Sequence, residues 1–203
     1  RIQEAIELIK DALTNKEEAD LYGILASLFD TNNELDIAER TLKDGLNIFP
    51  ADIDLHYKLG VIYEKTSRFG KSVKEMKEIL KIDKDNAEAL NFIGYGYADR
   101  GINLDEAEKL IKRAYALKPD NGFITDSLGW LYFKIGRMNL AITYLEKASN
   151  MLPEDPTIAE HLGDAYKMSG MVRKARRMYI KALRLSPLKK EELEKKINRL
   201  NRN

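Results

Sequence analysis

His56 and His161 are the two histidines of this 203-residue chain, and histidine is the side chain best suited to acid–base or metal chemistry near neutral pH. A zinc site or an activated nucleophile needs further ligands, or a nucleophile close to the imidazole. The chain has no cysteine, and the two histidines lack the H-E-x-x-H spacing of a metalloprotease helix. We therefore interpret both as structural or surface residues, with His56 facing the core, and expect no metal site.

The sequence also lacks a phosphate-binding loop. The string GYG at residues 94–96 lies inside a helical pattern, without the strand–turn–helix setting that such a loop needs. Carboxylates are abundant, but charged solvent faces of helices are their default explanation. The sequence thus predicts no catalytic residue and no cofactor, and it argues against an enzyme.

The composition indicates a chain that folds around a core without disulfides. Hydrophobic residues make up 44% and charged residues 33%, and no apolar run approaches the roughly 20 residues that cross a bilayer. The chain starts at Arg1 without a signal peptide, so we expect a fragment or a mature form that has lost a targeting segment. The formal charge of +1 combines −8 over residues 1–170 with +9 over residues 171–203, so the body is acidic and the tail basic.

A repeat with a period of 34 residues organises the chain. Small residues recur at steps of 34, 34, 35 and 34, at Ala26, Gly60, Gly94, Gly129 and Gly163. An aromatic follows three residues after each of them, and a second series of mostly small residues runs through Ala38, Ser72, Ala107, Ala141 and Ala175. The apolar spacing around both series is helical, so each repeat is predicted to hold two amphipathic helices, a first helix (A) and a second helix (B).

Local signals mark the ends of these helices. Gly101, Gly136 and Gly170 are predicted to end A helices, because glycine tolerates a positive φ. Asp52 and Asp155 are plausible N-caps, and Pro156 suits a first helical position. Gly129 lies inside an A helix, where we expect its missing side chain to let the partner helix approach closely.

The period, the L-G-x-x-Y core, the small residues and the prolines 34 apart at Pro119, Pro153 and Pro187 resemble the tetratricopeptide repeat (TPR). This resemblance implies an all-α, right-handed superhelical solenoid of antiparallel helix pairs. On its register, residues 1–18 are the second helix of a preceding partial repeat, and the array is expected to continue before Arg1. Five units follow at 19–52, 53–86, 87–121, 122–155 and 156–189, with one extra residue in the turn between the helices of the third. Residues 190–203 form a basic capping helix.

The A helices of such an array line an inner groove, and the helical wheel identifies the residues that face it. The predicted partner-binding residues are Tyr57, Asn91, Tyr95, Phe123, Asp126, Trp130, Phe133, Glu160 and Asp164. Equivalent positions in the first two repeats are Asp20, Gly23, Ser27, Asp30, Asp54, Val61 and Glu64. Aromatic rings where a solvated face would be polar suggest an interaction site, although packing against adjacent repeats is an alternative for Phe133, Trp130 and Tyr95.

The acidic residues along this face indicate the chemistry of the partner. A protein or peptide segment with basic and apolar residues would fit it, with Trp130 and Tyr95 as apolar anchors and Asp126 and Glu160 as charge partners. TPR proteins that capture chaperone C-termini use a Lys/Asn/Arg clamp for the terminal carboxylate. Only Asn91 fits that clamp here, so an acidic C-terminal tail is a poor candidate.

The basic end is a separate feature. Its cations are Arg173, Lys174, Arg176, Arg177, Lys181, Arg184, Lys189, Lys190, Lys195 and Lys196. Such a cluster is either a solvated terminal surface or a docking site for an anionic partner. Aromatics are not interleaved with the cations, so we expect no nucleic-acid partner.

The strings G-Y-x-x-A-D-R and D-S-L-G-W, at residues 94–100 and 126–130, resemble a class of bacterial TPR proteins. Many of that class are lipoproteins of the cell envelope, and some bring substrates to a periplasmic processing protease. The resemblance implies a non-catalytic scaffold or adaptor in the periplasm or at the outer membrane, with a cytoplasmic location as the alternative. A membrane contact is expected only through an N-terminal anchor outside this sequence. The alternative functions are a self-assembling structural module, and therefore a homo-oligomer, and an anionic-surface binder.

Overall fold

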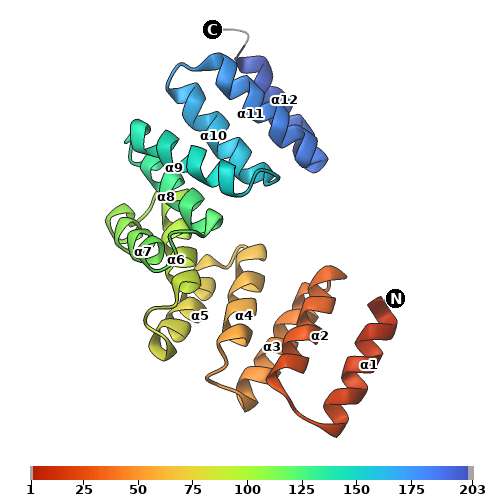
Figure 1. Ribbon diagram of the computed structural model, residues 1–203. Coiled ribbons are helices and arrows are strands. Elements are labelled where there is room, and N and C mark those ends of the chain that lie inside the picture. Colours follow the sequence, from red (N-terminus) through yellow and green to blue (C-terminus); the bar gives the residue numbers. More distant parts are fainter. Residues whose placement is uncertain (1, 201–203) are drawn as a thin grey trace. The chain divides into compact units, whose positions relative to one another are not determined.

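The computed structural model describes residues 2–200, and every regular element in that range is helical, which confirms the predicted all-α fold class (Figure 1). The helices are α1 (Ile2–Asn15), α2 (Ala19–Thr31), α3 (Leu35–Ile48), α4 (Ile53–Lys65), α5 (Phe69–Ile82), α6 (Ala87–Arg100), α7 (Leu104–Leu117), α8 (Gly122–Lys134), α9 (Met138–Met151), α10 (Pro156–Met168), α11 (Val172–Leu185), the 3₁₀ turn η1 (Pro187–Lys189) and α12 (Lys190–Arg199). Residue 1 and residues 201–203, which belong to the predicted segments 1–18 and 190–203, lie outside the described residues.

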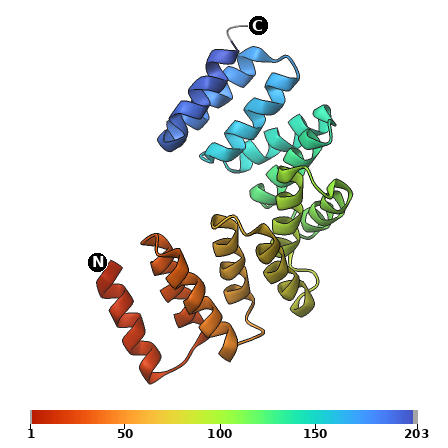
Figure 2. The same ribbon diagram turned by 180° about the vertical axis from the view of Figure 1, so that it is seen from behind.

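The chain divides into two compact units, Arg1–Phe92 (unit 1) and Ile93–Asn203 (unit 2), with the division inside α6. In unit 1, α2 pairs with α3, α4 pairs with α5, and α1 packs on α2. In unit 2, α8 pairs with α9, α10 pairs with α11, and α12 packs on α11; the reverse view in Figure 2 shows these neighbours again. Each A helix thus lies against the B helix that follows it.

Each unit has a core made from the repeat positions. In unit 1 the buried residues are Ile6, Leu25, Ala26, Phe29, Ala38, Leu42, Leu55, Leu59, Ile62 and Tyr63. In unit 2 a cluster is formed by Leu145, Ala159, Leu162, Ala165, Tyr166, Ala175, Tyr179, Ala182, Leu193 and Leu200. Leu193 lies in α12 and Leu200 is the residue at its C-terminal cap, so this helix and its end cover the apolar end of unit 2 with apolar side chains.

Glycines in the A helices create the space for helix pairing. A Cβ added at Gly129 would lie 2.7 Å from Leu145 Cγ and 3.0 Å from the backbone nitrogen of Leu145 in α9. A Cβ at Gly163 would lie 2.6 Å from Tyr179 Cε1 in α11. The close-approach role predicted for Gly129 is confirmed, and the space is taken by a large side chain of the B helix.

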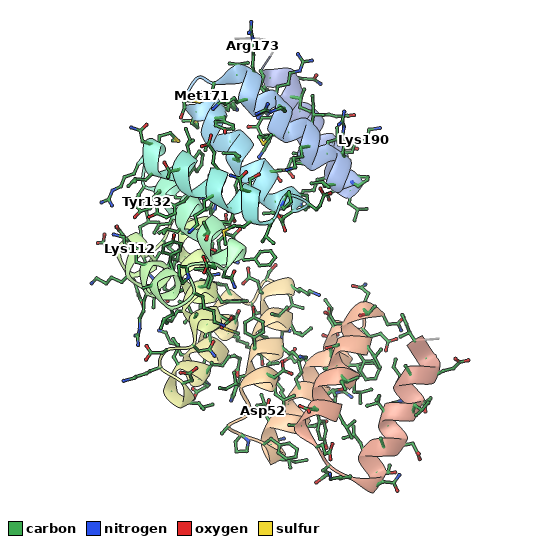
Figure 3. All side chains as sticks on the ribbon, viewed as in Figure 1. Asp52, Lys112, Tyr132, Met171, Arg173 and Lys190 are labelled. Atoms are coloured by element: carbon green, nitrogen blue, oxygen red, sulfur yellow. The ribbon has the colours of Figure 1, made fainter. Side chains whose placement is uncertain are left out.

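The helix ends follow the predicted signals. Asp52, labelled in Figure 3, accepts a hydrogen bond from the Leu55 backbone N–H at 2.9 Å and so caps α4. Asp155 caps α10 and is followed by Pro156 in the first turn. After the A helices, Gly101, Gly136 and Gly170 have φ of 66°, 76° and 72°. A left-handed residue at this point lets the following N–H return to a carbonyl of the last helical turn.

The third repeat carries its extra residue in the turn between its helices. Gly101 has the positive φ that every other repeat shows at this place, but Asn103 is left-handed as well, with φ of 47°. Two residues, Ile102 and Asn103, separate Gly101 from α7, whereas Arg137 alone separates Gly136 from α9. The insertion is therefore absorbed before α7 begins.

Candidate functional site

In unit 1, the predicted inner face forms an open groove between α2 and α4, called here the α2–α4 groove. Its wall contains the predicted positions Asp20, Ser27, Asp30, Asp54, Tyr57 and Val61, together with Ile24, Leu28, Thr31 and Lys58. Ala26, Leu42 and Ile62 line its floor. Ile24 has 47% of its surface exposed, so the groove offers apolar contact area to a partner.

The carboxylates of the α2–α4 groove are only loosely engaged. Asp54 accepts from Lys58 Nζ at 2.6 Å, within one turn of the same helix, and 58% of its side chain is exposed. Asp30 accepts from Lys65 Nζ at 2.6 Å. Asp20 has no ion pair with any residue of the described range. Exposed ion pairs of this kind contribute about 0–1 kcal/mol to stability, so a cation from a partner can replace the lysine of each pair.

Tyr57 and Asn91 are the two predicted binding residues of unit 1. Tyr57 is half-buried, and its ring centroid lies 6.0 Å from that of Phe92 with an interplanar angle of 78°. Burial, and secondly the negative charge of Glu88, raises the pKa of its phenol. Asn91 is also half-buried, and its Oδ1 is covered without a hydrogen-bond donor among the described residues.

In unit 2, Trp130 is not an exposed anchor. Only 8% of its surface is exposed, and its ring stacks on His161 at 4.0 Å on one side and on Phe133 at 4.8 Å on the other. Its Nε1–H donates to Asp99 Oδ1 at 3.0 Å. Stacked rings of unit 2 cover Trp130, so the expectation that this side chain is exposed to a partner is wrong. The structure supports the packing alternative for this residue.

The other aromatic positions of unit 2 differ in exposure. Tyr95 is half-buried, and its ring centroid lies 6.4 Å from that of His161. Burial, and secondly the negative charges of Asp99 and Asp126, raises the pKa of its phenol. Phe133 is half-buried under Trp130. Phe123, in the first turn of α8, has 58% of its surface exposed, so it is the predicted ring of unit 2 that a partner reaches most easily.

The predicted acidic residues of unit 2 are engaged by the chain itself. His161 Nδ1 donates to Asp126, with 3.0 Å to Oδ2. Lys196 of α12 donates to Glu160 at 2.7 Å and to Asp164 at 2.8 Å. Asp126 and Glu160 are buried, so they do not form an open acidic rim.

Glu160 shows how α12 holds this surface. Burial alone would raise the pKa of Glu160, but hydrogen bonds from Lys196 and Lys189 outweigh burial and lower it below its usual range. Lys189 contributes at 3.0 Å to the second carboxylate oxygen. We expected a basic and apolar segment of a partner protein to bind Glu160. In unit 2 the chain's own C-terminal segment takes this place, through Lys189 of η1 and Lys196 of α12.

Sequence reasoning missed His161, Asp99 and the two lysines as parts of this network. The signal that could have found them is the period itself: Asp126 and His161 are 35 residues apart, and Trp130 and Asp99 are 31 apart. One repeat length along the chain brings residues of consecutive A helices side by side. A search for polar pairs near that separation would have linked them.

His56 is a structural residue, in agreement with its predicted core-facing position. It is buried, with Nδ1 2.8 Å from Glu75 Oε2 and Nε2 3.1 Å from the Pro50 carbonyl oxygen. The hydrogen bond to Glu75 raises the pKa of His56, and burial opposes this only in part. Within residues 2–200 no group of three metal-binding side chains gathers around either histidine or elsewhere.

The fold and the repeats define the class of protein. A family model described as tetratricopeptide repeat matches residues 53–86 and 127–155. The chain therefore contains tetratricopeptide repeats, helix-pair units that serve in general as non-catalytic modules for protein–protein interaction.

Individual relatives agree with this assignment. TPR repeat-containing protein PA4667 of Pseudomonas aeruginosa is 32% identical over 166 residues, which are 81% of this chain and 28% of that protein. Anaphase-promoting complex subunit CDC16 of Saccharomyces cerevisiae is 28% identical over 151 residues, 71% of this chain and 18% of that protein. The chain thus spans less than a third of either relative.

Solved structures show the same fold. The APC/C hetero-tetramer Cut9–Hcn1 matches with a TM-score of 0.87 at 16% identity, over 97% of this chain and 39% of that chain. PilW, described as a widely conserved type IV pilus biogenesis factor, matches with a TM-score of 0.74 at 20% identity, over 82% of this chain and 77% of that chain. None of the helices within residues 2–200 combines the length and the apolar character needed to cross a membrane.

Proposed function

We propose that this chain is a protein-interaction scaffold whose α2–α4 groove holds a segment of a partner protein. The observation that carries the proposal is the contrast between two equivalent surfaces. In unit 1 the inner A-helix positions line an open groove, whereas in unit 2 Trp130, Asp126 and Glu160 are engaged by neighbouring residues of the chain. An open apolar groove with a few polar groups is the usual form of a binding site.

The chemistry of the groove favours a partner segment with basic and apolar side chains. Ile24, Leu28 and Val61 offer apolar contacts, and Asp20 and Asp54 offer carboxylates that a lysine or arginine can reach. Tyr57 closes one side of the groove and supplies an aromatic contact. Phe123 and Asn91 are further contact points in this proposal, each within its own unit.

We place this scaffold in the bacterial cell envelope, where it would bring proteins together during proteolysis or assembly. The support is the sequence relationship to a Pseudomonas aeruginosa protein and the resemblance of residues 94–100 and 126–130 to envelope TPR proteins. PilW, a pilus biogenesis factor, has the same fold.

The experiment compares captured proteins between two double variants. Asp20→Lys with Ile24→Lys changes the charge and the apolar surface of the α2–α4 groove. Asp36→Lys with Ile37→Lys makes the same change on exposed residues of α3, again with the aspartate in a first helical turn. The wild type and the α3 variant should cross-link and capture similar amounts of partner protein in the native cell. The amount captured by the groove variant should be at least about tenfold lower.

Melting curves of both variants establish that each is folded. Equal capture by the groove variant and the wild type would refute the groove as the binding site. Loss of capture by both double variants would show that general surface charge, and not the groove, decides binding.

A further inference from the structure

The outer face of α11 carries a row of positive charges without counter-ions. Arg173, Arg176, Arg177, Lys181 and Arg184 follow helical spacing, so they share one side of the helix. Within residues 2–200 none of the five forms an ion pair or a hydrogen bond. Arg173 points outward at the beginning of the helix, next to Met171 (Figure 3).

Several other cations of the same unit are, by contrast, paired. Lys189 and Lys196 pair with Glu160, and Lys174 of α11 itself lies 3.7 Å from Glu146 and over the ring of Tyr166. Like charges three or four residues apart on a helix repel and reduce its stability. The unpaired row therefore costs stability, and a ligand that neutralises it would recover that cost.

The row borders a groove, called here the α11 groove. Besides the five cations, it is lined by Met178, Ile180, Leu185 and the single carboxylate of Glu154. Met178, Ile180 and Leu185 are half-buried, so the apolar residues are recessed among the exposed arginines. From Arg173 to Arg184 the helix extends about 17 Å, which is long enough for several residues of a bound segment.

We propose that the α11 groove binds an acidic protein segment that carries apolar side chains among its carboxylates. Four of the five cations are arginines, whose planar guanidinium groups bind carboxylates with two parallel hydrogen bonds. The recessed Met178, Ile180 and Leu185 give the apolar side chains of such a segment a place to bury. The partner thus has the opposite charge to the one proposed for the α2–α4 groove, so the two surfaces select different segments.

The lining of the groove favours a protein segment over other anions. Nucleic-acid strands bind where aromatic rings stack on bases, and no aromatic residue lines this groove. A lipid surface is bound by apolar side chains that protrude beyond the charges, whereas Met178, Ile180 and Leu185 are recessed. Charge and shape together match carboxylates and apolar side chains on one chain.

Binding to defined probes tests the proposal, with the whole chain immobilised for biolayer interferometry. The probes are a synthetic peptide with glutamate and leucine at helical spacing, the same peptide with serine for leucine, a single-stranded oligonucleotide, and phosphatidylcholine vesicles containing phosphatidylserine. The wild type should bind the glutamate–leucine peptide most tightly, with an affinity that falls as salt increases. The triple variant R173E/R177E/K181E should weaken this binding about tenfold or more.

The matched control is K74E/K77E/K84E, which makes the same charge change on exposed lysines in and just after α5. It should leave the affinity within about twofold of the wild type. An equal loss in the control would overturn the proposal, as would tighter binding of the oligonucleotide or of the vesicles. Self-association that only R173E/R177E/K181E abolishes would assign the groove to a second copy and would also overturn it.

Discussion

Gly129 shows how a residue that is poor for a helix can be required by the packing of that helix. Glycine inside a helix costs about 1 kcal/mol relative to alanine. At position 129 a larger residue does not fit, because Leu145 occupies the space that a Cβ would need. The sequence predicted the close approach, since a glycine recurred at one register position beside large apolar residues.

We expect Gly129→Leu to lower the free energy of unfolding by about 1–3 kcal/mol or more, because the added side chain overpacks the contact with α9. Gly70→Leu is the matched control. Gly70 is also helical, but a Cβ there would meet nothing within 4 Å. Thermal and urea denaturation measure both variants. Equal stability of Gly129→Leu and wild type would contradict the close-packing explanation.

The pair of buried His56 and half-buried Glu75 gives unit 1 a dependence on pH. Because the folded-state pKa of His56 is raised, the stabilisation by Glu75 is fully present below the ordinary histidine pKa of about 6.5 and is lost as the pH rises through the raised value. The stability difference between wild type and Glu75→Gln should therefore be larger at about pH 6 than at about pH 8. Denaturation of both proteins across this range, with exposed Glu17→Gln as control, measures it. A pH-independent difference would contradict the ion pair.

Side-chain surroundings were the part of the site that sequence reasoning could not supply. The helical wheel placed Tyr57 on the inner face of its helix, and Tyr57 lines the α2–α4 groove, because the wheel fixes the direction of a side chain from its own helix. It placed Trp130 on the same face but could not show that His161, one repeat further on, stacks on it. What fills the space beside a helix depends on side-chain lengths in the next repeat.

Helices and turns were predicted more completely than the site. Their limits depend on local chemistry that can be read directly: Asp52 and Asp155 as caps, and glycine where φ is positive. α12 is the exception. Its basic composition predicted a solvated cap, yet Leu193 is buried and Lys196 reaches two carboxylates of α10.

We expect Lys196→Met to destabilise unit 2 by about 1–3 kcal/mol, because Glu160 would remain buried with a weakened set of donors. The neighbouring Lys195 is exposed on the same helix, so Lys195→Met should change stability by less than about 0.5 kcal/mol. Thermal denaturation followed by circular dichroism compares the two. If both variants melt alike, α12 is held by its apolar residues and the ion pairs contribute little.

Across the whole chain, the repeat predicted the fold class because a 34-residue period with two helical patterns has one common solution. The division into two units with separate cores was not predicted, since the sequence period continues through α6 without a break. The charge asymmetry found in the sequence has a structural counterpart. An open groove with carboxylates lies in unit 1, and an unpaired row of cations lies in unit 2.

The stacking of Trp130 between His161 and Phe133 has a practical consequence for how this chain can be studied. It is the only tryptophan, and it lies in unit 2, whereas unit 1 has tyrosines as its largest chromophores. Its fluorescence emission therefore reports the opening of unit 2 alone, while far-ultraviolet dichroism reports all helices together. The separation between the two transitions in one titration would measure how cooperatively an array of stacked repeats unfolds.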